Sequence, residues 1–234
     1  MSFLLILTQR RDKLFFIELQ KLFELEETMP KYVPEIKNAR REKIVDACET
    51  LYQNRAFGEI TFAEIGNAGG FTRTSLYTYF HTKEEIFLAL LQREYEKWKT
   101  DLDLIADPGR TLTAKQFAKQ LSQSLGKRIQ LLKLISMNLY AIEESSRDEN
   151  LVEFKKTYKA AVDSLENCLK NLKTKMTESE TEAFVYQFLP FMFGLYPYAF
   201  PSEKQKKAMK AAGMKLKKCT VSKLAYDAVL KLLK

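Results

Sequence analysis

The segment ITFAEIGNAGGFTRTSLYTYFHTKEEI, residues 60–86, carries the signals that decide the fold. Thr61 and Glu64 have the spacing of a capping box, in which a hydroxyl and a carboxylate satisfy free backbone N–H groups at a helix start. We therefore expect a short helix over residues 62–68. The Gly-Gly pair at 69–70 ends it, because glycine readily adopts the positive φ of a tight turn.

The second half of this segment predicts two more helices. Thr72 is placed to cap a helix that runs from Arg73 to about Phe80. Thr82 and Glu85 form another capping box, which opens a longer helix. Two short helices joined by a glycine turn are the requirement for a helix-turn-helix, whose second helix enters the major groove of DNA by its N-terminal end. A further helix is expected upstream, over residues 37–55, because apolar residues there recur at i, i+3, i+4 and i+7.

We expect eight side chains to contact DNA. They are polar residues near the helix starts and outward-pointing tyrosines: Thr61, Thr72, Arg73, Thr74, Ser75, Tyr77, Tyr79 and Lys83. Arginine can donate twice to guanine, and threonine can contact a thymine methyl group. Lys83, in the first turn of the longer helix, would hold a phosphate. Leu76 and Phe80, at i and i+4, would face the core, and the alternative for the two tyrosines is that they only pack.

The same 27 residues resemble the DNA-binding signature of the tetracycline-repressor (TetR) family of bacterial transcriptional regulators. The usual sequence of this signature is close to TTxxDIAxxAGVSxGTLYxYFxSKEEL. Identical or similar residues are Thr61, Ile65, Gly70, Thr72, Leu76, Tyr77, Tyr79, Phe80, Lys83, Glu84 and Glu85. The chain departs from the pattern with Gly66 and Gly69 for Ala, Phe71 for Val, and Thr74 for Gly. Each glycine should soften its helix by up to about 1 kcal/mol relative to Ala, and Thr74 should alter which bases are read.

The resemblance implies an all-α, ligand-responsive repressor that binds a near-palindromic operator in double-stranded DNA as a homodimer. Helices near the C-terminus would form a four-helix bundle between subunits, and a small-molecule effector would bind in each C-terminal domain and tilt the long helix. The implied domains are residues 29–86 for the helix-turn-helix and 87–234 for ligand binding and dimerisation. Residues 1–28 would be an N-terminal extension, or Met29 would be the natural start.

Composition supports a helical, cytoplasmic, non-enzymatic protein. The 234 residues include 8 Gly and 6 Pro, which is few. Cys48, Cys168 and Cys219 are far apart and form no metal or disulfide pattern, so we expect reduced thiols. His81 is the only histidine, and we place it at the surface near the phosphate backbone. We expect no catalytic residue, metal or cofactor. The apolar run at residues 3–7 is too short for a signal peptide or a membrane span.

The remaining sequence predicts further helices. The helix that starts near residue 83 should end at 107–109, and at about 1.5 Å per residue it would connect two domains rigidly. Apolar residues over 151–172 alternate in steps of three and four, which predicts a helix with one packed face. Residues 183–200 hold eight aromatics and no charge, but their prolines argue against a membrane span. We expect that helix to pack against its own domain and a second subunit.

Our candidates for the lining of an effector cavity come from these apolar segments: Met137, Tyr140, Phe188, Met192 and Tyr196. Ten Lys and two acidic residues lie from Phe200 onward, and they account for the net charge of +8. We interpret them as a solvated face. Two alternatives stay open: a helix-turn-helix protein without an effector, whose C-terminal domain only dimerises or binds proteins, and a helical protein of anionic membrane surfaces.

Overall fold

The computed structural model describes residues 32–107, 109–215 and 217–233, and this part of the chain contains helices and no strand. The helices are α2 (Tyr32–Asn54), the short 3-10 helix η1 (Phe57–Glu59), α3 (Phe62–Gly69), α4 (Arg73–Tyr77), α5 (Lys83–Ile105), α6 (Ala114–Lys127), α7 (Ile129–Glu144), α8 (Asp148–Lys170), α9 (Glu178–Ala199), α10 (Glu203–Ala211) and α11 (Val221–Leu232). The predicted all-α fold is confirmed. Expectations for residues 1–28 fall outside the described residues.

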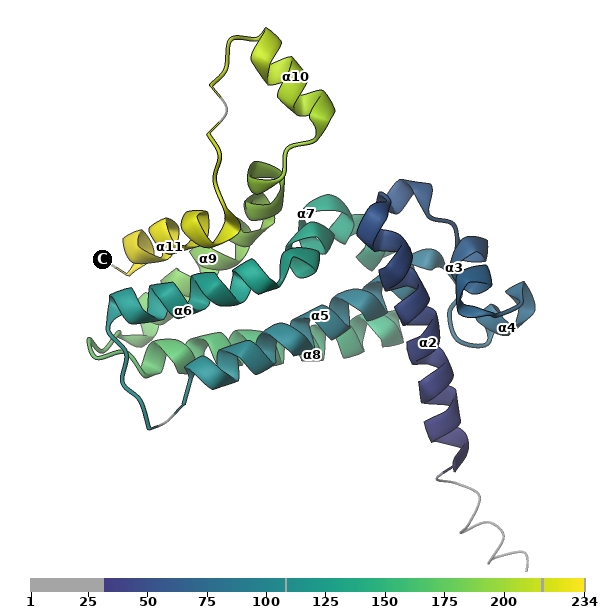
Figure 1. Ribbon diagram of the computed structural model, residues 1–234. Coiled ribbons are helices and arrows are strands. Elements are labelled where there is room, and N and C mark those ends of the chain that lie inside the picture. Colours follow the sequence, from purple (N-terminus) through teal and green to yellow (C-terminus); the bar gives the residue numbers. More distant parts are fainter. Residues whose placement is uncertain (1–31, 108, 216, 234) are drawn as a thin grey trace, which may run out of the picture.

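Helices α2, α3 and α4 form an N-terminal unit at one end of the molecule (Figure 1). Fully buried side chains form its core, among them Ile44 and Cys48 of α2, Ile65 of α3 and Leu76 of α4. The order of these helices is that of a helix-turn-helix, with α4 as the second helix of the motif.

α4 is shorter than the helix predicted over residues 73–80. After Tyr77 the hydrogen bonds change from the α-helical pattern to the tighter i to i−3 pattern, since the N–H of Thr78 donates to Ser75 (3.3 Å) and that of Tyr79 to Leu76 (2.9 Å). Such tight turns are common at helix ends. The turn still brings Phe80 into the core, where it is fully buried.

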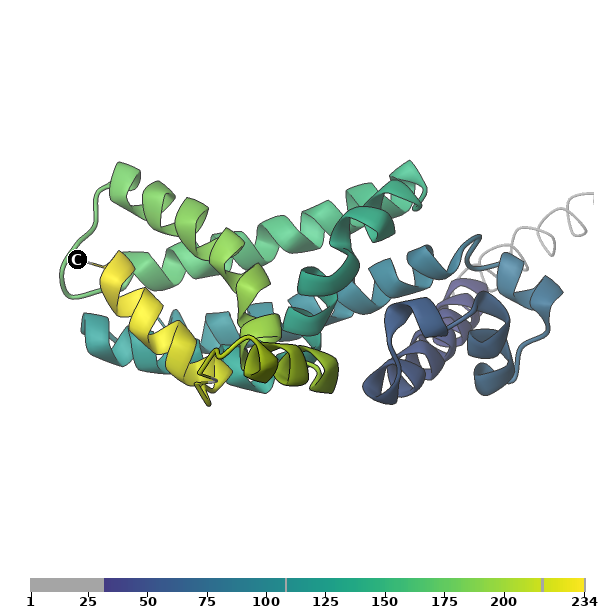
Figure 2. The same ribbon diagram turned by 90° about the horizontal axis from the view of Figure 1, so that it is seen from above.

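α5 begins in the N-terminal unit and continues into the C-terminal body, which is formed by α6 to α11 (Figure 2). Thr82 caps α5 by accepting a hydrogen bond from the N–H of Glu85 (3.2 Å). The helix has 23 residues, which at 1.5 Å each gives a length of about 35 Å. The predicted connecting helix is therefore present, and the predicted domain boundary at 86/87, which falls inside it, stays a prediction.

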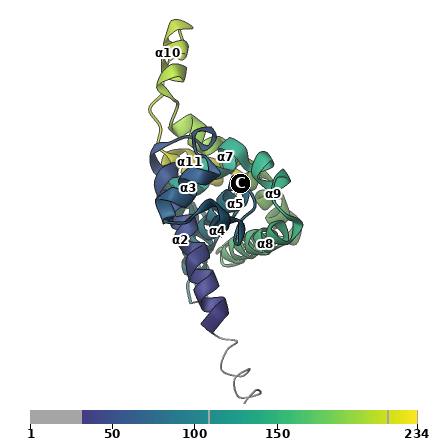
Figure 3. The ribbon, with the colours of Figure 1, turned by 90° about the vertical axis from the view of Figure 1, so that its right-hand side faces the viewer.

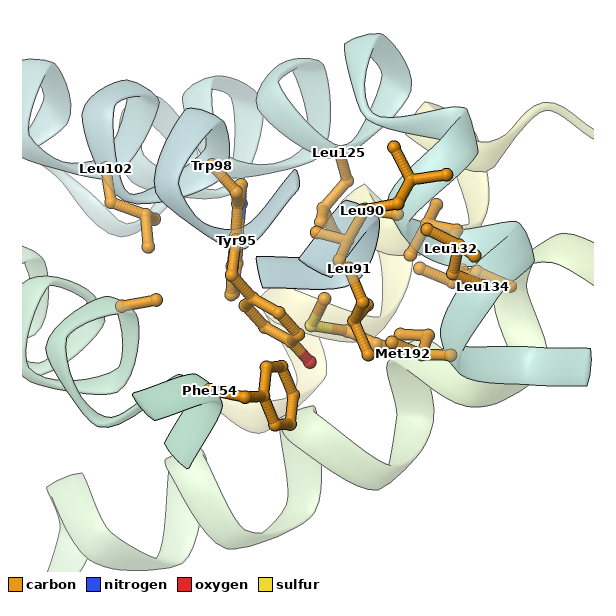
Figure 4. Packing of buried hydrophobic residues seen from close by; sticks show 14 of the residues in the cluster. Leu90, Leu91, Tyr95, Trp98, Leu102, Leu125, Leu132, Leu134, Phe154 and Met192 are labelled. Atoms are coloured by element: carbon orange, nitrogen blue, oxygen red, sulfur yellow. The ribbon is translucent and has the colours of Figure 1, made fainter. Parts of the chain in front are cut away.

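The C-terminal body packs α5 between its neighbours, with α8 along one side and α7 close to its first half (Figure 1). In the core, the ring of Tyr95 lies 5.8 Å from that of Phe154, and Trp98 donates a hydrogen bond to Ser124 (3.3 Å). Figure 4 shows how Leu91 of α5 and Met192 of α9 meet in this core. The predicted packed face of α8 is confirmed by its buried residues Phe154, Ala161, Leu165 and Cys168.

α9 is only partly buried. Phe184 and Phe188 lie in the core, whereas Tyr186 is 84% exposed and Tyr198 is 78% exposed. The helix accommodates Pro190 within it. None of the described helices is long and apolar enough to cross a membrane.

α10 projects away from the body, as Figures 1 and 3 both show. None of its residues is buried. The lysines of this segment therefore lie on an exposed face, in agreement with the interpretation of the basic tail as solvated.

Candidate nucleic-acid interface

The start of α3 is fixed by a closed set of hydrogen bonds. The N–H of Glu64 donates to the Thr61 hydroxyl (3.3 Å), and the N–H of Thr61 donates to the Glu64 carboxylate (2.8 Å). Arg55 adds an ion pair with Glu64 at 3.0 Å. The hydrogen bonds from Thr61 and Arg55 lower the pKa of Glu64 to about 2. The predicted capping box is present, and Thr61 lies exposed at the edge of the unit.

The turn between α3 and α4 depends on two glycines. Gly70 has φ of 74°, a left-handed conformation that glycine adopts without strain. A Cβ on Gly66 would lie 2.5 Å from Cδ1 of Leu76 and 3.2 Å from the carbonyl oxygen of Phe71. The predicted softening of the helix by Gly66 stays a prediction, and the structure adds a second role: the missing side chain lets α4 pack directly on α3.

One side of α4 is exposed and polar. Thr72 caps the helix by accepting a hydrogen bond from the N–H of Ser75 (3.2 Å). Arg73 and Thr74 are exposed. Tyr77 is 44% exposed, and its ring packs 5.1 Å from that of Phe62 in α3. With Leu76 and Phe80 in the core on the other side, as predicted, the exposed side chains point to solvent from a firmly held backbone.

Lys83 has bonds within the protein that the sequence did not predict. Its ammonium donates to the carbonyl oxygens of Phe57 and Ile60, both at 3.1 Å, and lies 4.3 Å from the centre of the Phe57 ring. These carbonyls belong to the loop between α2 and α3. An ammonium has three N–H donors, and Lys83 uses two of them to hold this loop.

A hollow of about 440 Å³ brings part of the predicted site together. Four of the eight predicted residues line it: Thr61, Arg73, Tyr77 and Lys83. His81 and Glu84 lie at the same hollow. The start of α3, the outer side of α4 and the start of α5 thus meet around one concave surface that carries two cations.

Tyr79 faces a different part of the surface. It is half-buried, its ring lies 6.2 Å from that of Phe71, and it lines a second hollow of about 360 Å³. Lys37 and Arg41 of α2 line the same hollow. They are cations close to the helix-turn-helix that our list of DNA contacts did not include, although the basic run KNARR at 37–41 was a signal for them.

The four described candidates for an effector cavity differ in their exposure to solvent. Phe188 and Met192 are buried in the core, Tyr196 is half-buried, and Tyr140 is 79% exposed. The placement of Tyr140 in an enclosed cavity is therefore corrected, because this side chain points to solvent. The side chain of Met137 lies outside the described residues.

A hollow of about 720 Å³ in the C-terminal body lies between α8 and α9 and is open to solvent. It is lined mostly by apolar and aromatic residues, and none of the five candidates is among them: Tyr158, Glu166, Ser179, Glu182, Ala183, Val185, Tyr186, Leu189, Pro190 and Phe193. The sequence analysis expected the aromatic helix over residues 183–200 to meet a second subunit, but it did not identify these residues as a hollow, because helical periodicity does not show which apolar residues remain uncovered. Within residues 32–107, 109–215 and 217–233, no cluster of three His, Cys, Asp or Glu residues is arranged to hold a metal.

Two family models match this chain. Residues 44–90 match the model described as bacterial regulatory proteins, tetR family, and residues 92–232 match the model described as tetracyclin repressor-like, C-terminal domain. A similar protein is YfiR of Bacillus subtilis (strain 168), described as an uncharacterized HTH-type transcriptional regulator. It is 28% identical over 78 residues, which is 33% of this chain and 38% of YfiR.

Two solved structures are similar to this chain, and the first of them shares its fold. The fatty acid degradation regulator FadR from Bacillus halodurans has a TM-score of 0.55 at 16% identity, over 83% of this chain and 94% of FadR. SmeT, the repressor of the Stenotrophomonas maltophilia multidrug efflux pump SmeDEF, has a TM-score of 0.42 at 20% identity, over 82% of this chain and 88% of SmeT.

Proposed function

The chain belongs to the TetR family of bacterial regulatory proteins and is a DNA-binding transcriptional regulator, and from this premise we propose that it represses transcription from a near-palindromic operator as a homodimer. The observation that carries this proposal is the outer side of α4. Arg73, Thr74 and Tyr77 are exposed there on a helix whose other side is buried, as a helix that reads base edges in the major groove must be.

In this proposal Arg73 and Thr74 read bases, while Thr61 and Lys83 contact phosphates on either side. Base contacts determine sequence preference, and phosphate contacts determine position on the duplex. Thr72, Ser75 and Tyr79 are also kept as proposed contacts. Thr72 and Ser75 are joined to each other at the start of α4, so they would act mainly by holding that start against the DNA backbone.

For the second subunit we propose the exposed face of α9. Tyr186, Pro190 and Phe193 form an apolar surface along the large open hollow. A surface of this kind is typical of a protein–protein contact. We expect Phe193→Asp and Tyr186→Asp to convert a dimer into a monomer in light scattering, with Tyr140→Asp, another exposed tyrosine, as the control that leaves the dimer intact. A wild-type monomer would contradict the proposal.

We further propose that a small-molecule effector releases the protein from DNA by entering the C-terminal body between α7 and α9. Phe188 and Met192 are nearly inaccessible there, so a ligand would have to separate the two helices. An apolar or aromatic ligand suits the apolar lining. The alternative is a regulator without an effector, and the observation in its favour is that Phe188 and Met192 are fully packed in the core.

The experiment that tests the proposed function is a gel shift with DNA from around the coding region, at rising salt and with competitor DNA. We expect a complex that survives competitor and a footprint with two half-sites about one helical turn, or a multiple, apart. Binding that shows no preference over competitor on any genomic fragment would contradict it. Titration of small apolar and aromatic compounds into the complex then separates the effector-responsive regulator from the alternative.

A further inference from the structure

The two ends of α7 both bind the N-terminal unit. At its C-terminal end, the turn that leads into α8 contacts the start of α5. Arg147 donates from Nε to Oε1 of Glu85 (2.6 Å), from Nη2 to Oε2 (3.1 Å) and from its backbone N–H to Oε1 (3.2 Å). Glu85 is 1% exposed. Loss of these donors would leave the buried carboxylate unpaired and would strongly destabilise the protein. The contact is therefore held in one well-defined arrangement.

The same carboxylate also holds the segment that follows the recognition helix. The backbone N–H of His81 donates to Oε2 of Glu85 (2.7 Å), and the Thr82 hydroxyl donates to the carbonyl oxygen of Ser145 (3.2 Å). The turn between α4 and α5 is therefore bonded directly to the turn between α7 and α8. These two turns are more than 60 residues apart in the sequence.

At its N-terminal end, α7 binds the C-terminal end of α2. The ammonium of Lys133 donates to the carbonyl oxygen of Tyr52 (2.7 Å) and that of Arg55 (3.4 Å), and it lies 3.8 Å from the centre of the Tyr52 ring. Gln130 donates to Glu49 of α2 (3.0 Å). A cation suits this place, because carbonyl groups without helical partners accumulate at a helix C-terminus.

We propose that residues 129–147, which we call the α7 strut, fix the orientation of the N-terminal unit on the C-terminal body, and that Arg147 is a positioning residue for operator binding. α5 joins the two parts through one helix, on which Arg93 holds α2 by ion pairs with Asp46 (2.7 Å) and Glu49 (3.0 Å). The strut adds one attachment at α2 and another at the start of α5, so the orientation is defined at three places. The importance of this orientation for operator binding rests on the proposed function.

The inner side of the strut faces the packed core. Leu131, Leu132, Leu134 and Ile135 are buried, and Figure 4 shows Leu132 and Leu134 beside Met192 of α9. A rearrangement of this core would therefore reach both attachments, because Lys133 lies on α7 and Arg147 lies in the short turn that follows it. Transmission of the rearrangement to these attachments does not require α5 itself to move.

The test is Arg147→Met, which removes the guanidinium and keeps an apolar stem. The matched control is Arg128→Met, which breaks another ion pair of α5, that between Arg128 and Asp101 (2.6 Å). This pair joins two parts of the C-terminal body and does not touch the N-terminal unit. Thermal unfolding of both variants checks that they fold, and Arg147→Lys, which keeps one donor group and the charge, should restore part of the effect.

The first readout is the distance between spin labels at Asn67→Cys in α3 and Lys170→Cys at the end of α8, two exposed positions. Cys219→Ser provides the background, and dilution with unlabelled protein isolates the distance within one chain. We expect a broader or shifted distribution in Arg147→Met and in Lys133→Met, and an unchanged one in Arg128→Met. A distribution in Arg147→Met equal to that of the wild type would overturn the proposal.

The second readout is affinity for DNA. Arg147→Met should weaken operator binding by about tenfold, which is within the usual range of coupling between sites. The affinity for random DNA should change by no more than about twofold, because single phosphate contacts do not depend on how the N-terminal unit is oriented on the C-terminal body. Equal loss on both DNAs, or no loss on the operator, would refute the role of Arg147. If the wild type binds no operator at all, the proposed function fails, while the spin-label distances still decide whether the strut exists.

Discussion

Gly66 in α3 lies against Leu76 in α4 so closely that a single added methyl group would be 2.5 Å from Cδ1 of Leu76. Leu76 is fully buried, so it has little room to move. We expect Gly66→Ala to lower the free energy of unfolding by about 1–3 kcal/mol, the usual effect of overpacking, although alanine favours a helix by about 1 kcal/mol over glycine. Urea unfolding followed by circular dichroism measures this difference.

The control is Gly194→Ala in α9. A Cβ at Gly194 has no neighbour within 4 Å, so only the gain in helix propensity remains and the protein should be equally stable or up to about 1 kcal/mol more stable. If both substitutions stabilise, Leu76 has room to repack, and the close contact does not explain the glycine.

Local signals predicted the helices well. The box formed by Thr61 and Glu64 predicted the start of α3 within the helix-turn-helix because every group involved lies within four residues. The turn at Gly70 was predicted for the same reason. The resemblance added the identity of the motif, and with it the place of α4 as the recognition helix.

Contacts between distant segments could not be predicted in this way. The space at Gly66 exists only because α4 packs there, and the bond from Arg147 to Glu85 joins residues 62 positions apart. The exposure of Tyr140 could not be predicted for a related reason. Tyr140 and Met192 both fit an apolar helical pattern, but only the packed structure shows that one is exposed and the other buried.

In the proposed function, Arg73 is the main side chain that recognises the base sequence of the operator. We expect Arg73→Ala to weaken operator binding by about 1–3 kcal/mol and to relax preference at one base pair. Competition binding against operators with single substitutions measures both effects. The control is Arg110→Ala, an exposed arginine beyond the far end of α5. If Arg73→Ala weakens random DNA as much as the operator, Arg73 contacts phosphate and does not read a base.

Lys83 combines a structural contact with a proposed phosphate contact. Lys83→Met removes both hydrogen bonds to the loop of Phe57 and Ile60, so we expect the free energy of unfolding to fall by about 1–2 kcal/mol. We also expect weaker binding to all DNA. The slope of the logarithm of the binding constant against the logarithm of the salt concentration should fall in magnitude by about one unit. These are measured by thermal unfolding and by binding at several salt concentrations. A loss of stability with an unchanged salt dependence would leave Lys83 with the structural contact alone.

Glu64 makes the stability of α3 depend on pH. Folding lowers the pKa of Glu64 from 4.5 to about 2, so the ionised carboxylate stabilises the folded protein. This contribution to stability is complete above about pH 5 and is lost as the pH falls through 4.5 toward 2. We expect the difference in unfolding free energy between the wild type and Glu64→Gln to be constant from about pH 7 to 5 and to shrink below that. The control is Glu178→Gln, an exposed carboxylate. A difference that stays constant down to pH 3 would exclude this role for Glu64.

The three thiols should differ in reactivity. Cys48 and Cys168 are buried and Cys219 is half-buried. Burial raises the pKa of Cys48, and it raises that of Cys168 to about 12, so both are present as unreactive thiols at neutral pH. We expect a disulfide reagent such as Ellman's to modify one thiol per native chain quickly and all three only in denaturant. Cys219→Ser should abolish the fast phase, and a fast phase that persists in this variant would mean that α2 or α8 opens to solvent in the native protein.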